Sequence, residues 1–230
     1  MARLLFHVGG PTFHPVAEQA REITEWLRDT GHTVDVAEGR EAFRRLGDCD
    51  LFVLMGLFHS GDRGCPYEPL SPDEREAFAR YVASGRPVLA HHGGIASYDD
   101  WPDFMRLVGF GWVWGRSRHS PFGTHVVRVV EPDHPVMAGM ADFVVEDEVY
   151  YDLWMDPRAR VHAVASWDGL DRPMVCTLEG RSEGPPGAGR VVYLANGHDL
   201  RAFRARWRAP GPPEAPLRRL WRNAVAWLVG

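Results

Sequence analysis

The chain has 230 residues, of which 45% are hydrophobic and 25% charged, and its formal net charge is −5 at pH 7. This composition is ordinary for a globular protein, and the negative charge gives no support for a nucleic-acid partner. The chain contains no lysine, which excludes a Schiff-base lysine, an anchor for pyridoxal phosphate and a P-loop lysine. No stretch resembles a linker, so we expect a single domain over residues 1–230.

The first half of the chain alternates predicted strands and helices. Apolar runs predict strands over residues 4–8, 33–37, 51–55 and 87–90. Apolar residues at helical spacing predict helices over 16–27, over 72–84 after a capping box at Ser71, and around 101–108. Repeats of this kind imply a parallel sheet that helices cover on both faces.

The second half is richer in predicted strands. Candidate strands cover residues 124–130, 144–150, 161–166, 174–178 and 191–195. Residues 201–216 are rich in arginine and proline and are expected to form a surface loop. Apolar residues from Leu217 to Leu228 recur at helical spacing and predict a C-terminal helix that packs on the sheet.

No apolar run reaches the roughly 20 residues that a membrane-spanning helix needs. The first residues read as a strand and not as a cleavable signal, so the expected location is the cytoplasm. The three cysteines, Cys49, Cys65 and Cys176, are odd in number and form no CxxC pair. This spacing argues against both a disulfide framework and a structural zinc site.

A strand followed by a glycine-rich turn is the most informative local feature. The sequence from Pro87 to Ser97 fits a nucleophile elbow, in which the apex residue is held above the carboxyl end of a parallel sheet and a helix follows. A hydrolase would carry serine at the apex and an amidotransferase cysteine. This chain carries His92 there, so the scaffold is expected without the usual nucleophile.

Histidines follow several of the predicted strands. They are His14, His59, His91, His92 and His198. Ligands of open parallel sheets bind outside the carboxyl ends of the strands, so we predict that His14, His92 and His198 line one crevice. Imidazole exchanges protons near neutral pH and binds metals. In the alternative interpretation, individual histidines cap strands or face solvent.

A consecutive acidic run, Glu146, Asp147 and Glu148, ends one predicted strand. Strand alternation would place Glu146 and Glu148 on one face and Asp147 on the other. A carboxylate on the crevice side could act as a general base, hold a sugar hydroxyl or ligate a metal. The alternative is a solvated strand end. Trp112, Trp114 and Trp154 could form aromatic walls for sugar rings or pack in the core.

Five segments in order resemble the trehalose-utilisation (ThuA-like) family. They are the His-Gly-Gly elbow, Trp114–His119, His134–Gly139, Asp147–Tyr150 and Gly189–His198. The resemblance implies an α/β fold of the class I glutamine amidotransferase-like superfamily. That fold is a flavodoxin-like three-layer sandwich with a mainly parallel sheet, here with β-rich additions in the second half. It also implies a link to trehalose and related keto-sugars or glycosides.

The resemblance places His92 where an amidotransferase has its cysteine and His198 where it has its catalytic histidine. Asp199 follows directly in place of the Pro-Glu expected there. The candidate catalytic residues are His92, Asp147, Glu148 and His198. The candidate substrate-binding residues are His14, His59, Gly93, Gly94, Ser117, His119, Tyr150 and Asp199.

Two functions remain open at this point. One is an isomerase, lyase or hydrolase that acts on a keto-sugar or glycoside through histidine and carboxylate acid–base chemistry. The other is a non-catalytic carbohydrate-binding or partner module that kept the fold. Cys65 follows the third strand and not the elbow, which disfavours a cysteine-dependent glutaminase. Converging histidines and carboxylates could also hold zinc or manganese, and a homo-oligomer is compatible with the chain.

Overall fold

Five parallel strands form one half of a ten-stranded sheet in the computed structural model, which describes residues 1–61, 65–180 and 189–230. They are β1 (Arg3–Val8), β2 (Thr33–Glu38), β3 (Leu51–Leu54), β4 (Val88–His91) and β13 (Val191–Leu194). Their order in the sheet is β2-β1-β3-β4-β13, and every neighbouring pair is parallel. The carboxyl ends of all five strands therefore meet at one edge.

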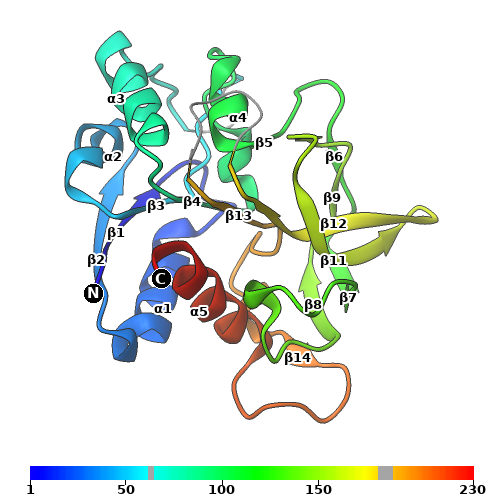
Figure 1. The fold of residues 1–230 in the computed structure, drawn as a ribbon. Helices are drawn as coiled ribbons and strands as arrows, with labels where there is room; N and C mark the ends of the chain where they lie inside the picture. The colour runs from blue at the N-terminus through cyan, green and yellow to red at the C-terminus, as the bar shows by residue number, and fades with distance from the viewer. Residues whose placement is uncertain (62–64, 181–188) are drawn as a thin grey trace.

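Helices cover both faces of the parallel half, which gives three layers (Figure 1). The helices are α1 (Val16–Leu27), α2 (Arg40–Arg44), α3 (Pro72–Ala83), α4 (Asp103–Val108) and α5 (Pro216–Val229). Helices α1 and α5 pack on one face, and α2, α3 and α4 lie on the other. Ser71 and Glu74 form the predicted capping box at the start of α3. Within the described ranges, no helix combines the length and the apolar character needed to cross a membrane.

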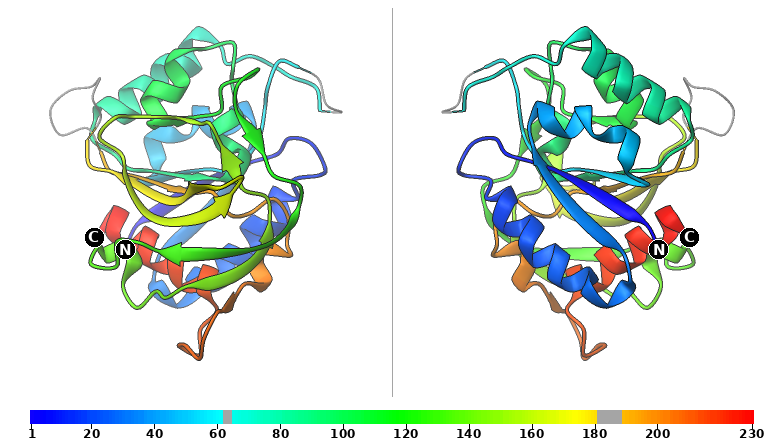
Figure 2. Two further views of the ribbon diagram at one scale, coloured as in Figure 1. Left: turned by 90° about the vertical axis from the view of Figure 1, so that its right-hand side faces the viewer. Right: turned by 90° about the vertical axis from the view of Figure 1, so that its left-hand side faces the viewer.

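Antiparallel strands extend the sheet beyond β13. They follow in the order β12 (Leu170–Leu178), β11 (Arg160–Trp167), β7 (Gly123–Val129), β8 (Phe143–Asp147) and β14 (Arg206–Trp207). Two small antiparallel pairs, β5 (Phe110–Gly111) with β10 (Trp154–Met155) and β6 (Arg118–His119) with β9 (Tyr150–Tyr151), lie outside the large sheet. Figure 2 shows the antiparallel half turned toward the viewer on its left side. The predicted α/β class with β-rich additions is confirmed.

The structure corrects three local predictions. The segment 201–216 is not only a surface loop, because β14 pairs with β8 and Phe203 packs on Trp26 with ring centroids 4.8 Å apart. The strand predicted over 144–150 ends at Asp147. The elbow opens into a 3-10 helix, η3 (His92–Ala96), and not into an α-helix. In each case a long-range contact decides the local conformation.

Candidate active site

A cavity of about 600 Å³ opens at the carboxyl edge of the parallel strands. The loops after β1, β3, β4 and β13 bring His14, His59, His92 and His198 to this edge, and the first, second and fourth of these side chains line the cavity. Glu148 lines it from the antiparallel half, just after β8. The cavity thus lies where the two halves of the sheet meet.

The elbow after β4 holds its apex residue in a strained conformation. His92 has a φ of +41°, in the left-handed region that side chains other than glycine rarely adopt. A Cβ on Gly93 would lie 2.8 Å from Cε1 of His14, and one on Gly94 would lie 2.4 Å from the carbonyl oxygen of Leu54. These two glycines do not line the cavity, contrary to their predicted role in substrate binding. They are needed because neighbouring groups pack directly on the turn.

The hydrogen bond of His92 determines its tautomer. Nδ1 lies 2.6 Å from the carbonyl oxygen of Ala195, and a carbonyl can only accept, so Nδ1 carries the proton. The lone pair is therefore on Nε2, which is buried and has no hydrogen-bond partner among the described residues. Burial lowers the pKa of His92 to about 3, so the ring is neutral at pH 7.

Asp147 supports the turn that carries His198 and does not itself line the cavity. Its fully buried carboxylate accepts hydrogen bonds from the backbone amides of Gly197 at 2.7 Å, Glu148 at 2.9 Å and His198 at 3.1 Å. The side-chain amide of Asn196 donates a fourth, at 3.1 Å. Burial raises the pKa of Asp147 to about 6, against the opposing effect of these donors. The predicted catalytic role of Asp147 is replaced by a positioning role.

Glu148 lies between two imidazoles. Its carboxylate oxygens are 3.1 Å from Nδ1 of His119 and 3.2 Å from Nδ1 of His198. Burial opposes ionisation, but the two rings outweigh it and hold the pKa of Glu148 well below its usual range. The predicted alternation is wrong here, because Glu148 lies beyond the end of β8 and turns inward, while Glu146 is exposed.

The side chain of His14 reaches the same point from the opposite side of the cavity. Its Nε2 is 3.1 Å from Nδ1 of His198. Burial, together with the neighbouring His92 and His198 rings, lowers the pKa of His14 to about 2. The structure therefore brings His14, His92 and His198 together, as the strand order predicted.

Aromatic rings form the walls of the cavity. Tyr150 packs over His92 with ring centroids 4.3 Å apart, and Trp112 meets Tyr150 edge-on. His59 stacks on Trp114 at 4.2 Å, so His59, a predicted substrate-binding residue, contributes a flat wall. Trp154 does not line the cavity; it lies in β10, paired with β5.

The remaining predicted residues divide between lining and support. Ser117 lines the cavity, but its hydroxyl donates to the carbonyl of Asp152 and accepts from the amide of Val113. Asp199 does not line the cavity, because its carboxylate binds the Arg201 side chain and amide. Ser117 thus shapes the wall, and Asp199 starts the next turn.

His91 lies on the opposite side of the strand from His92 and does not reach the cavity. Its fully buried ring packs near Phe203 and Trp221 beneath the sheet. A Cβ at Gly197 would lie 2.2 Å from Cε1 of His91, which explains why glycine is needed in the His198 turn.

Sequence reasoning missed two lining residues, Phe13 and Arg118. Each is the chain neighbour of a predicted residue, which was the available signal. Phe13 stacks near the ring of His198 with centroids 6.3 Å apart.

The order of the parallel strands and the strained elbow define the class of protein, the class I glutamine amidotransferase-like fold. A protein from Thermoplasma acidophilum described as part of a GMP synthase has this similarity, with a TM-score of 0.53, 14% identity, and 98% of this chain and 94% of that chain covered. The elbow residue of the present chain is His92, and no cysteine lines the cavity among the described residues.

The chain belongs to the ThuA family, described as trehalose utilisation, whose pattern matches residues 4–210. ThuA-like proteins of known structure share the fold over 99% of this chain and 90% of theirs. The protein from Parabacteroides merdae has a TM-score of 0.73 at 16% identity, and the one from Bacteroides uniformis 0.70 at 19%. No curated protein is significantly similar to the chain in sequence.

Proposed function

We propose that this protein is a carbohydrate-processing enzyme that moves a proton next to the carbonyl group of a keto-sugar or a related glycoside. The observation that carries the proposal is the position of Glu148. Its carboxylate is held between His119 and His198, faces a cavity, and stays ionised because both rings favour its charged form. A positioned, ionised carboxylate is a suitable general base.

The cavity suits a sugar. Its volume of about 600 Å³ is within the range of small-molecule sites. Tyr150, Trp112 and Trp114 offer aromatic faces on which the apolar face of a sugar ring can pack. The family description, trehalose utilisation, supports a disaccharide or its oxidised derivative as the substrate.

The chemistry that we propose is not covalent catalysis. His92 stands at the apex of the elbow, and its Nδ1 proton is committed to the carbonyl of Ala195. Cys49 and Cys176 are buried, and burial raises the pKa of both thiols, which disfavours the reactive thiolate. Cys65 does not line the cavity.

The division of roles follows from the geometry. Glu148 accepts the proton from a carbon beside the carbonyl group, or from water. The histidines opposite it, His14, His92 and His198, face the oxygen on which negative charge develops. Isomerisation, elimination and hydrolysis of a keto-glycoside all begin with a proton transfer of this kind.

The test is a screen of the purified protein against trehalose and other disaccharides, each in its oxidised (keto) and unoxidised form. Products are followed by NMR, in parallel samples with added Zn²⁺, with added Mn²⁺ and with a chelator. We expect turnover of at least one keto-disaccharide. Saturable binding of sugars without turnover in any sample would support the binding-module alternative, and neither binding nor turnover would reject the proposal.

A further inference from the structure

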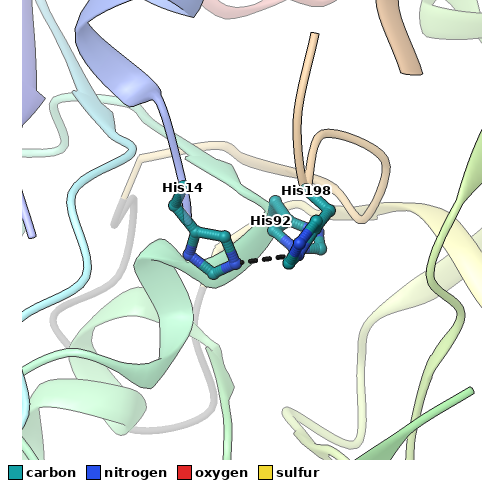
Figure 3. A group of neighbouring side chains, drawn as sticks. All are labelled: His14, His92 and His198. Atoms are coloured by element: carbon teal, nitrogen blue, oxygen red, sulfur yellow. Dashed lines mark hydrogen bonds between the residues drawn. The ribbon is translucent and has the colours of Figure 1, made fainter. Parts of the chain in front are cut away.

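Three imidazoles converge at the bottom of the cavity. His14, His92 and His198, which we call the three-histidine cluster, each offer a ligand atom, and these atoms lie within 4.8 Å of one another. Figure 3 shows the rings meeting from three separate segments, with a hydrogen bond between His14 and His198. The loops after β1, β4 and β13 supply one ring each.

His92 presents a lone pair with no protein partner. The carbonyl of Ala195 holds the proton on Nδ1, so Nε2 is an acceptor that is fully buried and unpaired among the described residues. A buried acceptor without a partner is costly in a folded protein. A backbone carbonyl that orients an imidazole and exposes its other nitrogen is the arrangement that metal-binding histidines use.

The contacts of His198 cannot all be satisfied by one proton. Its Nδ1 is 3.1 Å from Nε2 of His14 and 3.2 Å from the Glu148 carboxylate. One N–H on Nδ1 can point to only one of these two groups. A cation at this point would accept a lone pair from both rings and leave the carboxylate beside a positive charge.

We propose that the three-histidine cluster binds one divalent transition-metal ion, zinc in the first place, with Glu148 as the adjoining carboxylate. Bonds of about 2.0–2.1 Å at a tetrahedral angle place two zinc-bound nitrogens about 3.4 Å apart. The His14 and His198 nitrogens are already at 3.1 Å, and small ring rotations bring the ligand atoms, now within 4.8 Å, to this spacing. Three imidazoles favour zinc over the oxygen-preferring Mg²⁺ and Ca²⁺.

The metal adds a role to the cluster that rests on the proposed function. Three protein ligands leave a coordination position open toward the cavity, as in catalytic zinc sites. A sugar carbonyl or hydroxyl oxygen in that position would be polarised, while the carboxylate of Glu148 accepts the proton. Metal binding itself does not depend on this chemistry.

The experiment measures metal binding directly and not activity. Chelator-treated full-length protein is titrated with ZnCl₂, MnCl₂ and MgCl₂ by calorimetry, and the metal content after dialysis is determined by mass spectrometry. We expect one Zn²⁺ per chain and no comparable binding of Mg²⁺. His14→Ala and His198→Ala, on separate loops, should each weaken zinc binding by at least about 100-fold. His59→Ala, which lines the same cavity outside the cluster, is the matched control and should bind zinc as the wild type does.

The outcomes separate this inference from the proposed function. Failure of the wild-type protein to bind stoichiometric zinc would overturn it, and so would unchanged zinc binding by folded His14→Ala and His198→Ala. Circular dichroism identifies a variant that fails to fold, and the other variant then decides. Zinc binding without turnover of any sugar would leave the metal site standing and reject the enzyme, whereas turnover by protein that binds no metal would do the reverse.

Discussion

Two groups of histidines lie beside glutamates in this protein, and their surroundings differ. The three-histidine cluster lies at the parallel edge beside Glu148 and faces the cavity. The second group, which we call the His134–His162 pair, has stacked rings with centroids 4.2 Å apart and lies in the antiparallel half. It does not line the cavity.

The nitrogens of the His134–His162 pair all face protein groups. In His162 they face Thr177 at 2.7 Å and Glu131 at 2.6 Å. In His134 they face the amide of Val136 at 3.2 Å and Glu179 at 3.8 Å. In the three-histidine cluster, by contrast, Nε2 of His92 and Nδ1 of His14 have no hydrogen-bond partner among the described residues. Burial of imidazole beside a carboxylate therefore does not mark a site; lone pairs that face a cavity do.

The sharpest way to break this comparison is to neutralise the glutamate of each group. Glu148→Gln keeps the shape of the side chain and removes the proton acceptor, so we expect turnover of the keto-sugar to fall at least about 100-fold. Glu131→Gln is the matched control in the His134–His162 pair and should stay within about threefold of the wild type. Initial rates by NMR decide it, and equal effects of the two substitutions would contradict the comparison.

A second prediction concerns the support beneath the three-histidine cluster. Asp147→Ala removes an acceptor of four hydrogen bonds and leaves buried donors unpaired, so we expect a loss of about 3 kcal/mol in the free energy of unfolding. Asp147→Asn retains one acceptor oxygen and should lose less. Urea denaturation followed by circular dichroism measures both. A loss below about 1 kcal/mol in Asp147→Ala would show that the His198 turn holds without this carboxylate.

The pH dependence of stability tests the His134–His162 pair. Burial, with the nearby His134 ring, lowers the pKa of His162 to about 4, below its unfolded value of 6.5. The unfolded state thus binds more protons between these values, and the contribution of His162 to stability is lost as the pH falls from about 6.5 to 4. We expect His162→Gln to flatten the unfolding free energy over this window by about 1–3 kcal/mol. An unchanged profile would mean that His162 titrates normally in the folded protein.

The smallest effect is expected at the partly exposed thiol. Cys65 lines small cavities beside Phe58 and not the candidate site. Cys65→Ser should therefore change turnover by less than about twofold. The same rate assay applies, and a large loss would revive a covalent mechanism and contradict the non-covalent reaction that we propose.

Much of the fold could be predicted because it depends on local pattern. The apolar run from Leu4 to Val8, the Ser71 capping box and the helical spacing after Leu217 each act within a few residues. The elbow at His92 was also recognisable, since its glycines are adjacent in sequence. Parallel strands align their carboxyl ends, so the placement of His14, His92 and His198 at one edge followed from the strand order.

The site chemistry could be predicted only in part. The sequence by itself determined that histidines and a carboxylate follow strand ends, because strands and tight turns are specified locally. Only the tertiary structure decided that Glu148 turns inward while Asp147 holds the His198 turn, because both side chains lie where β8 ends and alternation no longer applies. It also decided that His91 packs beneath the sheet while the strained apex brings the next ring into the cluster. These outcomes depend on contacts between segments about 50 to 180 residues apart, such as Asp147 with Gly197 and His14 with His198, which no local pattern encodes.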